Sequence, residues 1–238
     1  MAEKIINLDG VEVTFFKSSK AKNINISIKP NRGVRVSVPR FVSFKNAERF
    51  AHQKMDWMKK HLSKMQTLEN KATVFNIDTK FSTKQHQLHI IKKDISSCKT
   101  IIKNGLLKVF VPFSMQVSSN ECQAYIRQFI EHTWRREAKE LLPKRTAELA
   151  QIHGFKFNKV SIRNSKTRWG SCSFNNNINL SLHLMMLPNH LIDYVILHEL
   201  AHTKEKNHGI YFWKLLDNVT GNAKGLDKEV KQYRIGVF

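Results

Sequence analysis

Short segments with alternating apolar and polar residues open the chain. In "INISIKPNRGVRVSVP" the alternation covers residues 24–28 and returns over residues 34–38, with PNRG between them. This pattern predicts a β-hairpin with one apolar face. A helix should follow, because Ser43 is a suitable N-cap and apolar residues recur at spacings of three and four over residues 44–65.

The same pattern returns about 73 residues later. "QLHIIKKDISSCKTIIKNGLLKVFVP" again supplies strands, and the capping-box pattern of Ser118 and Glu121 predicts a second long helix after them. We therefore predict a duplicated β-hairpin–helix module over residues 1–145, with copies at about 11–70 and 71–145. Two copies are too few for a solenoid.

The character of the sequence changes near residue 146. "FNKVSIRN", "TRWGSCSF" and "NINLSLHLMML" predict three short strands separated by turn residues. Pro188 and Asn189 then open a helix that runs into a cluster of histidines. We expect residues 146–238 to form a small domain in which a short antiparallel sheet packs on this helix, so the fold class is α+β.

The histidine cluster has the spacing of a metal site. His198 and His202 are four residues apart, so both imidazoles can reach one ion from the same side of a helix. Glu199 lies beside that face, where a carboxylate can take the proton of a metal-activated water. The flanking residues are apolar, and buried polar side chains without partners are costly. The HExxH pattern therefore predicts a zinc ion that serves peptide hydrolysis.

A catalytic zinc site needs a third protein ligand and one open position. His208 is the favoured third ligand, because the polar "KEKN" before it suits a chain that turns back after the helix. Glu205 and Glu229 are the carboxylate alternatives. His183 and His190 precede the cluster and are expected to be structural.

The segment "TRWGSCS" is a candidate substrate-binding element. We expect an edge strand beside the helix, on which an extended peptide could lie by strand addition. This expectation assigns Arg168, Trp169, Gly170 and Ser171 to substrate binding, with Trp169 either a wall of the cleft or a core residue. Cys172 is expected to be a small buried residue and not a zinc ligand.

Several segments together resemble a known family. "RWGSCS", "NINLSLHLMMLP", "IDYVILHELAH" and "NHGIYFW" are similar to segments of the YgjP-like zinc metallopeptidases, relatives of the SprT-like proteases. The resemblance extends to "GVRVSVP", "AERFAHQKMDWMKKHL" and "WRREAKELLP", and so covers most of the chain. It implies a zincin-like domain over residues 146–238 that binds one Zn²⁺ through His198, His202 and His208, with Glu199 as the general base.

The charge of the chain suggests a second kind of partner. Lysine and arginine number 40 against 19 acidic residues, and residues 1–119 carry 22 basic and 8 acidic groups. This imbalance suits sequence-independent binding of nucleic acid by residues 1–145, since no base-reading motif is present. A solvated lysine surface without a partner explains the charge equally well. Basic residues of the first predicted helix that lie off its apolar face are Lys45, Arg49, Lys60 and Lys64.

Other features narrow the setting. The three cysteines are odd in number and far apart, so neither a disulfide framework nor a CxxC zinc knuckle is available, and a metal must be held by nitrogen and oxygen. The segment "MAEKIINLDG" lacks the apolar region of a signal peptide, and no apolar run approaches the roughly 18 residues of a membrane span. We expect a cytoplasmic protein with no membrane partner.

Three functions remain open from the sequence. The leading hypothesis is a zinc-dependent endopeptidase of narrow specificity. One alternative is a zinc-stabilised nucleic-acid-binding protein whose hydrolase activity is vestigial, and another is a metal-dependent amidase or other hydrolase that acts on smaller molecules. Glu199 favours hydrolysis, because a purely structural metal site has no use for a general base.

Overall fold

The computed structural model describes residues 3–29, 33–69, 73–236 and 238, with side chains omitted for residues 64–69. The described residues form an α+β protein, as the sequence predicts. Contacts within the chain group it into two compact units, which divide at about residue 72. Each unit has its own hydrophobic core.

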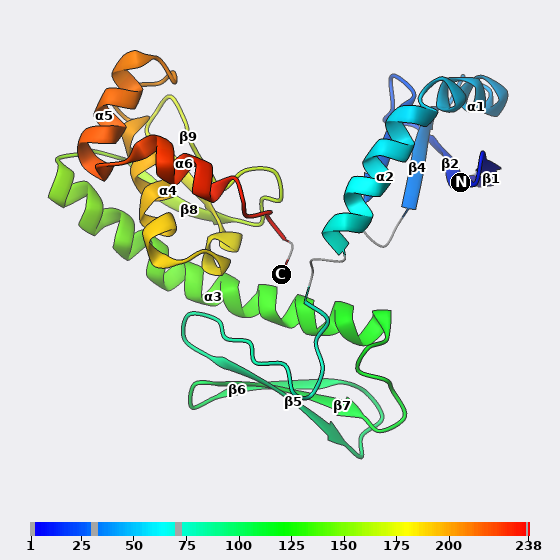
Figure 1. Cartoon of the computed structure of the whole chain (residues 1–238), viewed down its shortest axis with the longest axis horizontal. Helices are drawn as coiled ribbons and strands as arrows, with labels where there is room; N and C mark the ends of the chain where they lie inside the picture. The colour runs from blue at the N-terminus through cyan, green and yellow to red at the C-terminus, as the bar shows by residue number, and fades with distance from the viewer. Residues whose placement is uncertain (1–2, 30–32, 70–72, 237) are drawn as a thin grey trace. The chain divides into compact units, whose positions relative to one another are not determined.

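The first unit is a four-stranded sheet followed by two helices. The strand order is β1-β2-β4-β3, in which β2 and β4 are parallel and the other pairs are antiparallel. The alternating valines of β4 point into the core, where they meet Ala47, Ala51 and Met58 of the helices. The elements of this unit, drawn blue to cyan in Figure 1, are β1 (Glu3–Leu8), β2 (Val11–Ser18), β3 (Asn25–Lys29), β4 (Gly33–Pro39), α1 (Phe44–Gln53) and α2 (Met55–Glu69).

The predicted hairpin is confirmed in this unit, whereas the predicted single helix is two. Strands β3 and β4 pair as expected, and residues 30–32 of the PNRG turn lie outside the described residues. Ser43 caps α1 and accepts a hydrogen bond from the backbone N–H of Asn46 at 3.3 Å. The helix stops at Gln53 and α2 starts at Met55. The break at Lys54 contains neither glycine nor proline, so no local signal in the sequence marks it.

The second unit contains two three-stranded sheets and the remaining helices. Helix α3 runs between the β5–β7–β6 sheet on one side and helices α4 and α6 on the other (Figure 1). The elements are β5 (Gln87–Lys93), β6 (Lys99–Lys103), β7 (Leu106–Pro112), α3 (Asn120–His153), β8 (Lys159–Arg163), β9 (Gly170–Cys172), β10 (Asn177–Ser181), the 3₁₀ helix η1 (Leu182–Met186), α4 (Asn189–Ala201), α5 (Ile210–Thr220) and α6 (Ala223–Val230).

The sheet that precedes α4 is mixed, so the prediction of an antiparallel sheet is wrong. Its strand order is β8-β10-β9, and β10 is antiparallel to β9 but parallel to β8. The tight turn at residues 173–176 makes β9 and β10 a hairpin. The longer connection over residues 164–169 carries the chain past the sheet, so that β10 enters between the two earlier strands. The order leaves β9 at an edge, beside α4.

The two predicted copies share this same strand order. In the first copy β2, β4 and β3 are neighbours, and in the second copy β5, β7 and β6 are, with the first and third strands parallel in both. Lys17 of β2 donates to backbone carbonyls in residues 39–42, and Lys92 of β5 donates to carbonyls in residues 112–115. These shared contacts are compatible with a duplication, which stays a prediction. The two copies fall in different compact units.

Helix α3 continues through residue 145, where the sequence suggests a boundary between domains. Its N-cap is Ser119, which accepts a hydrogen bond from the N–H of Cys122, so the predicted cap at Ser118 is one residue too early. Beyond Pro143 the apolar periodicity continues, with Leu149 and Ala150 buried. The β5–β7–β6 sheet, α3 and α4 consequently share one core. Among the described residues, no helix is both long and apolar enough to cross a membrane.

Candidate metal centre

The histidine cluster forms where the chain reverses direction after α4. The helix ends at Ala201, and His202 occupies the C-cap position with α-helical backbone angles. The backbone N–H of Thr203 and that of Lys204 close tight turns on Leu200 and Ala201, at 2.9 and 3.0 Å. The chain then returns, so that His208, immediately before α5, lies against the end of α4. Local backbone geometry therefore brings a residue outside the helix onto the face that carries the HExxH motif.

The ring nitrogens of the three histidines converge. Nε2 of His208 lies 3.0 Å from Nε2 of His198 and 3.2 Å from Nε2 of His202. Within the described part of the chain, these three form the group of His, Cys, Asp or Glu side chains that could share an ion, with ligand atoms within 4.8 Å of one another. A tetrahedral zinc ion with Zn–N bonds of about 2.0–2.1 Å separates its ligand nitrogens by about 3.3–3.4 Å. The observed spacing therefore fits such an ion closely.

Neighbouring groups hold the rings in this arrangement. Nδ1 of His202 lies 3.0 Å from the carbonyl oxygen of Glu205, a contact that keeps the proton on Nδ1 and leaves the Nε2 lone pair free. The buried ring of Phe212 on α5 contacts all three imidazoles, with centroid distances of 4.9 Å to His198, 4.5 Å to His202 and 4.7 Å to His208. An apolar floor of this kind excludes water from one side of the cluster.

Burial keeps the imidazoles of His198 and His202 neutral. It lowers the pKa of His198 to about 4, and the charges of His202 and His208 lower it further in the same direction. The pKa of His202 is also lowered, chiefly by burial. Neutral imidazole is the form that binds a metal, so the pKa shifts favour occupation of the cluster by a cation at neutral pH.

Glu199 carries a buried carboxylate, and one of its oxygens has no hydrogen-bond partner in the described residues. The residue is 5% exposed, and Oε2 has no hydrogen-bond partner among the described residues. Burial raises the pKa of Glu199 to about 8, against a smaller opposing effect of the positive charge of Arg168. An unpaired buried carboxylate is costly, and costly groups of this kind are commonly retained where they take part in chemistry.

Glu205 and Glu229, the alternative third ligands, are not part of the group of converging side chains. The carboxylate of Glu229 is 2.8 Å from Nε2 of His190, in an ion pair between α6 and the start of α4. Glu205 meets the cluster through its backbone carbonyl. His183 is fully buried and bonds through Nε2 to the side-chain oxygen of Asn164 at 2.9 Å. These positions agree with structural roles for His183 and His190.

The "RWGS" residues lie on and before strand β9, next to α4. Arg168, Trp169, Gly170 and Ser171 line a cavity of about 330 Å³. Trp169 is half-buried and packs on the core, and its charged neighbour Arg168 is exposed but close enough to act on Glu199. Cys172 is also half-buried. The edge position of β9 is the feature that strand addition requires.

Two residues at the site, Phe212 and Lys206, make contacts that the sequence does not predict. Phe212 was visible only as part of "NHGIYFW", four residues after His208, a spacing that places it one turn away. Lys206 lies in the loop between the second and third histidines and donates to the carbonyl of Ser173 at 3.3 Å and to Oδ1 of Asn176 at 2.5 Å. It ties this loop to the β9–β10 turn. Only the tertiary structure shows that contact.

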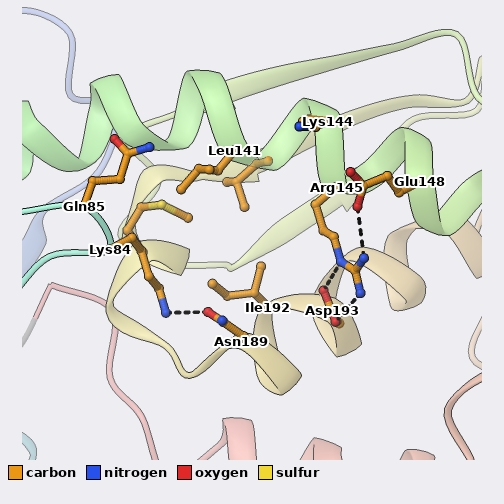
Figure 2. Close-up of a pocket in the computed structure, with 11 residues that line it drawn as sticks. Lys84, Gln85, Leu141, Lys144, Arg145, Glu148, Asn189, Ile192 and Asp193 are labelled. Atoms are coloured by element: carbon orange, nitrogen blue, oxygen red, sulfur yellow. Dashed lines mark hydrogen bonds and ion pairs between the residues drawn. The ribbon is translucent and has the colours of Figure 1, made fainter.

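A separate cavity of about 460 Å³ lies between α3 and α4 and contains none of the three histidines (Figure 2). Its charged groups are largely paired. Arg145 forms two 2.8 Å bonds with Asp193, and Lys84 donates to Asn189 at 2.8 Å. Burial lowers the pKa of Lys84. These pairs connect α3 to α4 and thereby support the helix that carries the HExxH motif.

The predicted nucleic-acid surface remains a prediction. Lys45, Arg49 and Lys60 are exposed on α1 and α2, and the side chain of Lys64 lies outside the described residues. Exposure of lysines is what a solvated surface shows as well, so it does not distinguish the two explanations.

The chain was compared with known proteins. Residues 22–233 match the model of a family described as "YgjP-like, metallopeptidase domain". Two solved structures are similar, the metallopeptidase zymogens abylysin of Pyrococcus abyssi and jannalysin of Methanocaldococcus jannaschii, each with 26% identity. The match with abylysin covers 39% of this chain and 93% of that chain with a TM-score of 0.36, and the match with jannalysin covers 38% and 94% with a TM-score of 0.34. No curated protein matches the chain.

Proposed function

Because the chain belongs to the YgjP-like metallopeptidase family, we propose that it is a zinc-dependent peptidase whose centre is the histidine cluster at the end of α4. The family supports a peptidase that uses a metal. The observation that carries the assignment to particular residues is the convergence of three histidine nitrogens, 3.0 and 3.2 Å apart, beside a buried and unpaired glutamate.

In this proposal His198, His202 and His208 hold one Zn²⁺ through Nε2. When bound there, zinc supplies Lewis-acid chemistry, which polarises the scissile carbonyl and lowers the pKa of water. The positive charge of a bound ion would favour the carboxylate form of Glu199. This carboxylate would accept the proton of the attacking water and pass it to the leaving amine, so that the peptide bond breaks without free hydroxide or free amide anion. Nδ1 of His202, bonded to the carbonyl of Glu205, keeps its ring oriented throughout.

An extended peptide is the substrate that the edge strand favours. Among the described strands, β9 pairs with β10 alone, and the backbone groups of its other edge could pair with a peptide laid alongside. Arg168, Trp169 and Ser171 would then contact substrate side chains next to the metal. A hydrolase for small molecules would have less use for an open strand edge, and this difference favours the endopeptidase over the amidase alternative.

The metal assignment is tested by measuring zinc in single histidine variants. His198→Ala, His202→Ala and His208→Ala should each lose most bound zinc, because two ligands hold the ion far more weakly than three. His190→Ala is the matched control. The ring of His190 pairs with Glu229 and not with the histidine cluster, so this substitution should leave the zinc content unchanged. Full retention of zinc in His208→Ala would shift the third ligand to Glu205 or Glu229.

The substrate class is tested separately. A Glu199→Gln variant that still binds zinc should retain substrates that it cannot cleave, and these can be captured from cell extract and identified by mass spectrometry. Peptides or unfolded proteins that the wild-type protein cleaves and that a metal chelator protects would support the peptidase. Cleavage of small amides alone would instead support the amidase.

A further inference from the structure

Strand β9 lies directly against the Glu199 carboxylate at Gly170. A β-carbon built on Gly170 would lie 2.6 Å from Oε1, 2.7 Å from Cγ and 2.8 Å from Cδ of Glu199. Real β-carbons essentially never approach other heavy atoms this closely. The Glu199 side chain therefore occupies the place where any other residue at position 170 would put its own side chain.

The backbone conformation does not call for glycine at this position. Six other glycines in the described residues have positive φ angles, which L-residues rarely adopt, whereas Gly170 lies in an extended strand outside that region. Any residue could take up its φ and ψ. The one feature that explains the missing side chain is the contact with Glu199.

Hydrogen bonds on both sides of Gly170 hold the strand in place. Gly170 pairs with Leu180 of β10, and the carbonyl of the preceding Trp169 accepts a 2.8 Å hydrogen bond from the N–H of Ser181. At the other end of the hairpin, Lys206 holds the turn through Ser173 and Asn176. A side chain at position 170 would therefore displace the movable partner, which is the Glu199 side chain.

We propose that Gly170 is a positioning residue for Glu199. The proposal rests on the proposed function: the bare backbone of β9 closes one side of the Glu199 carboxylate and confines it to the rotamer that faces the attacking water. The segment "RWGS" then has a divided role, in which Gly170 acts on the general base while Arg168, Trp169 and Ser171 remain available for substrate. The absence of a side chain is the functional feature.

The test compares Gly170→Ala with Gly209→Ala. Gly209 also lacks a positive φ, follows His208 directly, and has nothing within 4 Å of an added β-carbon, so its substitution should change kcat less than about twofold. Gly170→Ala should keep its zinc and its substrate KM while kcat falls at least tenfold, approaching the roughly 10²–10⁴-fold that loss of a general base costs. Wild-type kcat in Gly170→Ala would overturn the proposal.

A double-mutant cycle tests the contact without any assay of activity. Gly170→Ala should lower Tm by about 2–4 °C in the wild-type background. The same substitution should have no such effect in Glu199→Ala, where the space is free. Equal shifts in both backgrounds would overturn the inference. If the wild-type protein cleaves no peptide but the two substitutions are coupled in Tm, the proposed function fails and the contact between Gly170 and Glu199 stands. If Glu199→Gln is inactive while Gly170→Ala is fully active, the proposed function stands and the positioning role of Gly170 fails.

Discussion

Glu137 and Glu199 are both buried glutamates on helices of the same compact unit, but their surroundings are opposite. Glu137, on α3, is 1% exposed and its carboxylate has four partners: the hydroxyl of Thr83, the backbone N–H groups of Lys84 and Gln85, and the ring of His86. Glu199, on α4, is 5% exposed and has an oxygen without a partner in the described residues.

The difference separates a structural carboxylate from a reactive one. The four partners of Glu137 compensate its burial and fix the loop at residues 83–86 on α3. Glu199 lacks this compensation, and burial raises its pKa to about 8. A carboxyl group that is costly to bury and has no compensating hydrogen bond is best explained by a part in the chemistry of the site. Burial of an acid alone would not have told the two apart.

The largest expected effect concerns activity. Glu199→Gln should keep the fold and the zinc but lose nearly all hydrolysis, by roughly 10²–10⁴-fold, because an amide cannot accept the proton of water. Glu137→Gln should keep kcat per folded molecule. Peptidase assays on the two purified proteins, with zinc content measured in parallel, check this contrast. Undiminished proteolysis in Glu199→Gln would remove the general base from the mechanism.

Stability should show the opposite order. Glu137→Gln replaces one carboxylate oxygen by an NH₂ group that cannot accept a hydrogen bond, so the N–H of either Lys84 (on Oε2) or Gln85 (on Oε1) loses its acceptor, and we expect a loss of about 1–3 kcal/mol in the free energy of unfolding. Glu199→Gln should cost little, since Oε2 has no hydrogen-bond partner in the described residues to lose. Urea denaturation of both variants measures the difference. Equal destabilisation would mean that the hydrogen bonds of the Glu137 carboxylate contribute no more stability than the surroundings of Glu199.

A third glutamate should show almost no effect. Glu229 pairs with His190 at the surface, where both side chains are about half exposed. Exposed ion pairs contribute roughly 0–1 kcal/mol, so Glu229→Gln should change stability by no more than that. Its zinc content should equal that of wild type. Zinc analysis and a urea titration of this variant are sufficient, and a clear loss of metal would make Glu229 a ligand.

Predictions from the sequence succeeded where the determining contacts are local. The hairpin of β3 and β4 and the Ser43 cap follow from alternation and from a side chain three residues before its partner. The spacing of His198 and His202 likewise follows from helical geometry. The prediction of an antiparallel sheet was wrong because distant segments decide the outcome: β10 enters between β8 and β9, which makes the sheet mixed. The predicted cap of α3 at Ser118 was wrong by one residue, because two adjacent serines are both suitable caps.

The sequence by itself determined which side chains can carry chemistry in this protein: two histidines and a glutamate on one helical turn, with a third histidine six residues on. Only the tertiary structure decided how they meet. The return of the chain after α4 sets His208 against the other two, the pairing of Glu229 with His190 engages that carboxylate elsewhere, and β9 presses its bare backbone on Glu199 at Gly170. Helical periodicity acts over a few residues and can be read from spacing, whereas contacts across an interface between strand and helix depend on packing that no local pattern encodes.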